Sequence, residues 1–498
     1  MDFLLHFLAY SPQSGFLFTS PDFWVFLCLV TGGFSLCYKN RRLRNLFLFA
    51  CSLFFYYKIA GLFVFILLLS VFLNYHIGKR IGQSSSKRFW LCVGVGANLL
   101  ILFIFRYNVF FTELWNAFWG GGLPAIDYLS GGIPFNYAAA TIERLLPPVG
   151  LAFFTFQAIS YLVDLKRGDT QPAESFSDFG FYMSFFPQLA AGPIVRADEF
   201  LPQLKRHYML TRQEFSYALV LIVCGLFKKI LVADYLSLNL VSPIFDNPDL
   251  FTGLEKWAAV YGFSLQIYCD FSGYTDIALG VAALFGFQLP ANFRSPYKAS
   301  SLTDFWHRWH ITLSSWFKDY LYIPLGGNRH GVFRTTAAIL VTMLAAGFWH
   351  GASIGFIIWG GLHGVALCIE KLTRWHIFTE RNRTLRLIGW LLTFHIVGMA
   401  WIFFRAGSLQ TASDMFFGLF DNMGWTQLPQ ILAWHGEALL MMILMFLFLL
   451  VVRERQKKTL ARTFERLPLV AKFLLVAAAI FLIVFYGNSP AAGFIYFK

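Results

Sequence analysis

The chain has 498 residues, of which 57% are hydrophobic and only 13% carry a charged side chain. Its mean hydropathy is +0.58, whereas about 25% of the residues of a soluble globular domain are charged. The composition therefore excludes an ordinary soluble enzyme and predicts a polytopic membrane protein. The net charge is +13, from 40 Lys and Arg against 27 Asp and Glu. In a membrane protein the placement of these cations sets the orientation, and we expect no nucleic-acid partner.

Apolar stretches that could cross a bilayer recur along the whole chain. A spanning helix needs about 20 mostly apolar residues, and about twelve stretches approach this length. They are residues 23–38, 45–57, 60–76, 89–107, 148–163, 214–233, 256–286, 336–350, 353–370, 387–404, 435–452 and 469–486. We therefore predict an all-α polytopic membrane protein, with residues 1–498 forming a single membrane-embedded domain.

Short basic segments between these stretches indicate the orientation. The clusters are residues 39–44, 79–88, 166–167, 196–212, 294–334, 371–386 and 453–458. Because Lys and Arg accumulate in cytoplasmic loops, threading the chain through them places both termini on the extracytoplasmic side. Residues 176–193, which contain two prolines, and the polar residues 302–320 fit poorly as crossings. We expect both to be re-entrant or interfacial, since irregular backbone is tolerated at membrane depth only where protein or water satisfies it.

Residues 302–320 read as one amphipathic helix. Apolar residues recur at steps of three and four, which predicts one apolar face. The opposite stripe carries Thr303, His307, His310, Ser314 and Lys318. Such a helix could simply lie among lipid headgroups. Alternatively, the stripe lines a cytoplasmic mouth, where Arg308 and Lys318 attract an anionic cofactor and His310 faces the reaction path.

The stretch "LAAGFWHGASIGFIIWG" carries His350 within a segment, residues 335–369, that has no Asp, Glu, Lys or Arg. An ionisable group in a membrane segment is costly, and by default it indicates a functional site. Histidine can also take up and release a proton near neutral pH. Gly347 and Gly351 on either side would let a substrate approach the ring. The competing interpretation is a histidine that packs against another helix.

Three other chemical interpretations of the histidines and Ser353 are weaker. "GASIG" matches the G-x-S-x-G elbow, but that motif requires a preceding strand. His350, His363 and His395 could suggest haem ligation, yet His395 stands alone on its segment. His307 and His310 have half of a zinc spacing without a matching Cys or carboxylate pair. We predict neither a metal site nor a tightly bound cofactor.

The segment 256–286 contains Asp270, Tyr274 and Asp276 within a membrane-length stretch. Intramembrane carboxylates are expensive unless they are paired or hydrated. A proton-coupled transporter would use such groups, which makes transport the main alternative function. An enzyme could use them to bind a sugar hydroxyl or to orient a base.

The sequence resembles the membrane-bound O-acyltransferases. The resemblance rests on "DFWHRWHITLSSWFKDYLYIPLGGNR" from Asp304, followed by "FWHGAS" from Phe348. Supporting stretches are "AAGPIVRADEFLPQL", "YCDFSGYTDIALG", "NFRSPYKASSLTDFW", "WGGLHG" and "YGNSPAAGFIYF". The similarity is closest to the bacterial branch that acetylates alginate, other exopolysaccharides or peptidoglycan. His307 departs from the family pattern, where Arg is common, and Leu362 stands where Tyr often precedes the histidine.

The resemblance implies a helical bundle around a central funnel or pore, with a signature core at about 148–405 and flanking helices in 1–147 and 406–498. It implies that His350 and His310 are the catalytic pair. The side chains that we expect to bind substrate are Asp270, Tyr274, Asp276, His307, Arg308, Ser314 and Lys318.

The resemblance further implies acyl transfer, with acetyl-CoA or an acyl carrier protein thioester as the cytoplasmic donor. The acceptor would be a polysaccharide hydroxyl or an extracytoplasmic partner acetyltransferase, and the chain would lie among lipids in a bacterial inner membrane. D-alanyl-type transfer to a teichoic-acid-like polymer and transport through Asp270 and Asp276 remain alternatives.

Overall fold

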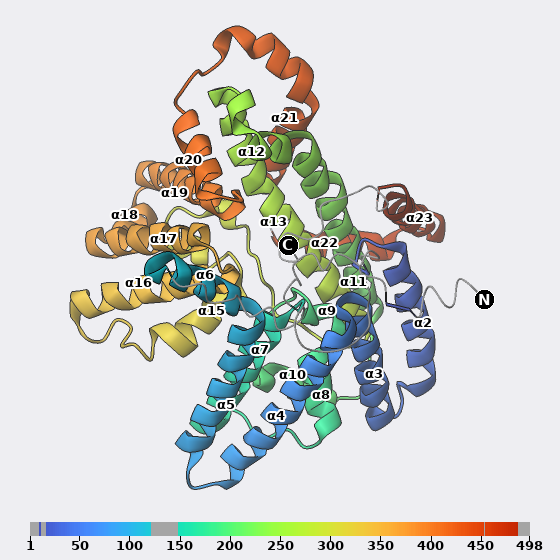
Figure 1. Ribbon diagram of the computed structural model, residues 1–498. Helices are drawn as coiled ribbons and strands as arrows, with labels where there is room; N and C mark the ends of the chain where they lie inside the picture. The colour runs from blue at the N-terminus through green and yellow to red at the C-terminus, as the bar shows by residue number, and fades with distance from the viewer. Residues whose placement is uncertain (1–8, 11–15, 121–147, 453, 487–498) are drawn as a thin grey trace.

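The computed structural model describes residues 9–10, 16–120, 148–452 and 454–486 (Figure 1). Across these ranges every regular element is helical, and none is a strand. The predicted all-α class is therefore confirmed. The two ends of the chain, whose side of the membrane we predicted, lie outside the described residues.

Within the described ranges, seven helical segments are long and apolar enough to cross a membrane. They are Arg41–Gln83, Lys87–Tyr107, Arg212–Asp246, Gly331–His350, Ile354–Thr373, Arg383–Arg405 and Trp425–Val451. A multi-pass membrane protein is thus confirmed. Other expected spans correspond to shorter or more polar helices, so the count of about twelve stays a prediction.

The first half of the chain builds one group of helices. In order they are α2 (Pro21–Cys37), α3 (Arg41–Ala60), α4 (Val64–Gln83), α5 (Lys87–Leu102), η2 (Phe103–Tyr107), α6 (Asn108–Trp119), α7 (Leu151–Arg167), α8 (Phe176–Ser184), α9 (Phe186–Leu189) and α10 (Ala197–Leu204). Residues 176–193 are broken, as predicted, and the break falls at Phe185, just ahead of Pro187.

The second half of the chain supplies a further set of helices. They are α11 (Arg212–Leu226), η3 (Phe227–Asp234), η4 (Ser237–Val241), α12 (Ser242–Asp246), α13 (Gly253–Leu284), η6 (Pro296–Lys298), α14 (Leu302–Trp306), α15 (Ile311–Phe317), η7 (Lys318–Tyr322), α16 (Gly331–His350), α17 (Ile354–Thr373), α18 (Trp375–Arg381), α19 (Arg383–Arg405), α20 (Leu409–Gly418), α21 (Leu428–Val451), α22 (Glu454–Arg466) and α23 (Leu469–Tyr486).

The long helix α13 runs through the centre of the molecule (Figure 1). The helices α2–α5 and α7–α10 lie to one side of it, and α16–α19 lie to the other. Among the described residues two large apolar cores and one small cluster result, and α13 contributes to both large cores: Tyr274 packs into the first, and Phe271 into the second. The two cores meet where α14 and α15 join α16 and α17.

The single amphipathic helix predicted for 302–320 is wrong. Helix α14 ends at Trp306, and α15 begins at Ile311. Between them His310 adopts the left-handed conformation, with φ 42° and ψ 55°. As a result His307 is exposed while His310 is buried, so they do not share a polar stripe.

Helices α16 and α17 form a tight hairpin with glycines at the contact. A Cβ atom on Gly347 would collide with the carbonyl of Phe356, and one on Gly360 would collide with that of Met343. Small residues let membrane helices approach to this distance. Gly347 therefore serves helix packing, and not the substrate access that we inferred from sequence.

This contact predicts a position-specific effect of adding one methyl group. Gly360→Ala should lower the stability of the purified protein by about 1–3 kcal/mol through overpacking. The adjacent Gly361→Ala is the matched control, because its new Cβ would meet only the Leu344 side chain, at an ordinary 3.7 Å. Thermal unfolding in detergent measures both, and equal melting temperatures would contradict the contact.

Candidate active site

His350 is the last residue of α16. Two residues of η2 hold the backbone at this end of the helix. The Arg106 guanidinium donates to the His350 carbonyl at 2.6 Å, and the Tyr107 hydroxyl donates to the Phe348 carbonyl at 3.1 Å. Carbonyls in the last turn of a helix have no partner within the helix, and they favour a cation. Arg106 thus fixes the helix end that carries His350.

Aromatic rings surround the His350 imidazole. The rings of Trp349 and Trp359 lie 5.0 Å from it, and that of Phe404 lies 5.1 Å away. The residue as a whole is partly exposed, while its Nδ1 atom is buried. The ring therefore lies in a largely aromatic environment.

Asn292, which is fully buried, holds the turn that carries His310. Its backbone carbonyl accepts from the Ile311 amide at 2.9 Å. Its side-chain oxygen accepts from the Thr312 hydroxyl at 2.6 Å and from the Thr312 amide at 3.3 Å. The Thr312 hydroxyl in turn accepts from the Ile194 amide at 3.0 Å. These bonds fix a non-glycine residue in a conformation that costs of the order of 1–3 kcal/mol and that is common at functional sites.

The His310 ring lies among Phe271 at 4.7 Å, Trp349 at 6.1 Å and Phe153 at 6.4 Å. Burial lowers the pKa of His310 to about 3, so its imidazole is neutral at physiological pH. Trp349 touches both histidine rings. The structure thus places both histidines singled out from the sequence against this indole.

Helix α17 ties the His310 segment to the His350 hairpin. The buried Glu370 carboxylate accepts from the amides of Leu302 at 2.6 Å and Thr303 at 3.2 Å, which are the free donors at the start of α14. Further along the same helix, Trp359 packs on His350. Sequence analysis assigned no role to Glu370 or Arg106, although each is a charged residue at the edge of an apolar stretch.

The two aspartates of α13 form buried ion pairs. Asp276 lies 2.7 Å from Lys228, and Asp270 lies 2.6 Å from Lys229, which also contacts Asp234 at 2.7 Å. Sequence analysis missed both lysines, although two adjacent lysines inside the predicted span 214–233 were the available signal. The aspartates are therefore charge partners of η3, which lowers the cost of burying them.

A small polar cavity of about 50 Å³ lies beside the Lys228 and Asp276 pair. Ser272, Thr275 and Asn292 also line it. Since Asn292 holds the His310 turn, this cavity borders the back of the His310 segment. Asp276 and Asn292 thus line the same cavity, and a role of Asp276 in substrate binding stays a prediction.

The other expected substrate-binding residues are scattered. Tyr274 is buried and stacks on Phe18 at 4.5 Å, in the first core. The Ser314 hydroxyl donates to the Trp309 carbonyl at 3.0 Å, and Arg308 pairs with Asp304 at 2.7 Å. His307 and Lys318 are exposed. The side chains of Arg308 and Ser314 are partly exposed.

Ser353 has a structural role. It is the N-cap residue of α17, and its hydroxyl accepts from the Gly355 amide at 3.3 Å. A helix precedes it instead of a strand, so the G-x-S-x-G geometry is not formed.

Comparison with known proteins identifies the family of the chain. Residues 173–413 match the model of the MBOAT, membrane-bound O-acyltransferase, family. The chain is 37% identical over 419 residues to a probable alginate O-acetylase of Azotobacter vinelandii, covering 82% of this chain and 79% of that protein. It is 35% identical over 411 residues to a peptidoglycan O-acetyltransferase of Helicobacter pylori, covering 76% and 74%. A teichoic acid D-alanyltransferase of Bacillus subtilis is 26% identical over 353 residues, covering 67% and 80%.

The chain belongs to the membrane-bound O-acyltransferase family. It is a multi-pass membrane enzyme that transfers acyl groups to oxygen.

The buried ion pairs generate a prediction that separates a structural role from transport. Lys228→Met alone should destabilise the protein by about 3–5 kcal/mol, because it removes the ammonium group that lies 2.7 Å from the buried Asp276 carboxylate. The double variant Lys228→Met with Asp276→Leu should recover most of that loss. Thermal unfolding of the two variants and of Asp276→Leu measures the coupling. Strictly additive effects would argue against the pair.

Proposed function

We propose that His350 is the general base of acyl transfer from a thioester donor to a hydroxyl acceptor. The observation that carries the proposal is the pair of imidazoles, His310 and His350, that both pack against Trp349. Histidine suits this role because it exchanges protons near neutral pH, and positioned general bases contribute about 10²- to 10⁴-fold.

The chemical step is a single displacement. The acceptor oxygen attacks the thioester carbonyl carbon while His350 removes the hydroxyl proton. The new C–O ester bond forms, the C–S bond breaks, and the proton passes from the imidazolium to the departing thiolate. His310, held neutral by burial, is suited to hydrogen bonding with the acyl donor. The aromatic walls reduce solvent reorganisation, and holding the two reactants together supplies the entropic advantage.

We propose that the donor approaches from the side of the basic loops, which we assign to the cytoplasm. His307 and Lys318 are exposed, and Arg308 is partly exposed. Cations at this position favour an anionic donor, such as acetyl-CoA or an acyl carrier protein thioester, which acts as a co-substrate and not as a resident cofactor. The donor path would also be lined by four other expected substrate-binding residues, namely Asp270, Tyr274, Asp276 and Ser314.

The acceptor class follows from the relatives, two of which are named for alginate and peptidoglycan O-acetylation. We propose acetyl transfer to a hydroxyl of an extracytoplasmic polysaccharide, or to a partner acetyltransferase that completes the reaction. The chain would form about twelve spans around a central funnel in a bacterial inner membrane, with both termini outside the cytoplasm. D-alanyl-type transfer is the second candidate, since a D-alanyltransferase is also a relative. Transport is less favoured, because Asp270 and Asp276 are paired with lysines.

The first test removes the imidazole. In a deletion strain, His350→Ala at matched membrane abundance should lower the O-acetyl content of the surface polymer by at least about 10²-fold. His310→Ala should also be impaired. His76→Ala is the control, because His76 is an exposed imidazole on the spanning helix α4. NMR of the purified polymer measures the esters, and full acetylation by His350→Ala would make His350 a packing residue.

The second test concerns donor binding. In membrane vesicles, Lys318→Gln should raise the KM for the thioester donor several-fold, about the effect of losing one exposed charge contact of up to 1 kcal/mol, with kcat nearly unchanged. The difference from wild type should shrink at high salt. Lys87→Gln, an exposed lysine at the start of α5, is the control. An unchanged KM for Lys318→Gln would remove this surface from the donor path.

A further inference from the structure

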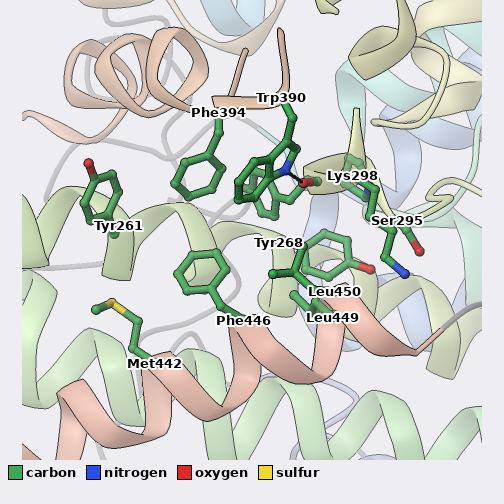
Figure 2. Close-up of a pocket in the computed structure, with 12 residues that line it drawn as sticks. Tyr261, Tyr268, Ser295, Lys298, Trp390, Phe394, Met442, Phe446, Leu449 and Leu450 are labelled. Carbon is green, nitrogen blue, oxygen red and sulfur yellow. Dashed lines mark hydrogen bonds between the residues drawn. The ribbon is translucent and has the colours of Figure 1, made fainter. Parts of the chain in front are cut away.

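A second cavity, of about 190 Å³, lies away from the two histidines (Figure 2). It is enclosed by α13, the segment around η6, α19 and α21. Figure 2 shows the rings of Phe394 and Phe446 on opposite sides, from α19 and α21, with Tyr261 from α13 at one end. Its lining residues are Tyr261, Tyr268, Ser295, Pro296, Tyr297, Lys298, Trp390, Phe394, Met442, Phe446, Leu449 and Leu450.

Most polar atoms of the lining are engaged with protein partners. The Tyr297 hydroxyl donates to the Ser264 carbonyl, and the Trp390 indole donates to the Tyr297 carbonyl at 2.8 Å. The Tyr261 hydroxyl is hydrogen-bonded to His395 Nε2 at 3.0 Å. What faces the cavity is therefore carbon from aromatic rings and aliphatic side chains. Cavities of this kind do not hold water and accept hydrocarbon.

The cavity lies within the span region and close to one membrane face. Helices α19 and α21 are both candidate spans. Lys298 donates to the carbonyl of Val452, the residue that follows α21, at 2.8 Å. Figure 2 shows Lys298 and Ser295 together at the end of the cavity away from Met442 and Tyr261. A half-buried ammonium group at this level meets the phosphate layer of the leaflet that the basic loops border.

We propose that this cavity binds one acyl chain of a membrane phospholipid, whose phosphate is held at Lys298. The stripe Met442, Phe446, Leu449 and Leu450 repeats at helical spacing and supplies one wall for the chain. The hydrocarbon fits the apolar lining, and the phosphate complements the lysine. A soluble anion would satisfy only the second feature.

The bound lipid would support the aromatic residues that pack against the His310 turn. The rings of Tyr268 and Tyr297 line the cavity, and they also lie 6.4 Å and 6.2 Å from the ring of Trp309, which precedes His310. Packing is therefore continuous from the cavity to the His310 turn.

Native mass spectrometry of the detergent-purified chain tests the proposal. Wild type should retain one phospholipid and should rebind long-chain phosphatidylglycerol after delipidation, but not a short-chain analogue or inorganic phosphate. Leu449→Trp, which fills the cavity, should abolish retention. Leu447→Trp is the matched control, because Leu447 is an exposed residue of α21 outside the lining. Lys298→Gln should weaken rebinding about tenfold, as expected for one lost hydrogen bond to a charged group.

A photoreactive acyl chain provides a second readout on the wild-type protein, where folding of a variant is not in question. Cross-links from vesicles of labelled phosphatidylglycerol should map to Phe446 or Leu449. Equal retention by Leu449→Trp and Leu447→Trp, or cross-links confined to the outer face of α21, would overturn the proposal. Binding of inorganic phosphate alone would overturn it as well.

Discussion

The hydrogen bonds that Asn292 makes to the turn before α15 are the constraint on which the site depends. They replace the bonds that a continuous helix over 302–320 would have made, and they keep His310 in the left-handed region. Without them the chain would relax towards the amphipathic helix that its periodicity favours. The imidazole would then move towards the exposed stripe of His307. Burial of His310 against Phe271 and Trp349 is thus a consequence of one asparagine that is distant in sequence.

The membrane explains why the buried charged side chains near the site each contact a partner on another element. An isolated ionised group at this depth is costly, so each has a partner whose position the fold fixes. Arg106 lies at the carbonyl end of α16, Lys228 pairs with Asp276, and Glu370 receives two amides of α14. Each contact joins two different elements. The same groups that avoid the cost of an unpaired charge therefore align the helices that carry the histidines.

The sequence could predict those features of the fold and the site that depend on residues close together in the chain. It could not predict those that depend on contacts between residues that are distant in sequence. Hydropathy indicated the helical class and placed His350 at the end of a span, because both follow from residues that are neighbours in the chain. The motif spacing singled out His310 as well. The break at residues 307–310 could not be read locally, because its cause lies at Asn292. The pairing of Asp270 and Asp276 with Lys229 and Lys228 also needed the three-dimensional contact between α13 and η3.

The hairpin of α16 and α17 shows how two distant signature segments behave as one unit. Gly347 and Gly360 bring the two backbones into contact, which places Trp359 against His350. The same α17 holds the first turn of α14 through Glu370. The segment that carries His310 therefore cannot shift without displacing α17. A displacement of α17 would in turn displace His350. Because closely packed side chains resist small continuous deformations, this arrangement couples the position of the His310 segment to that of His350.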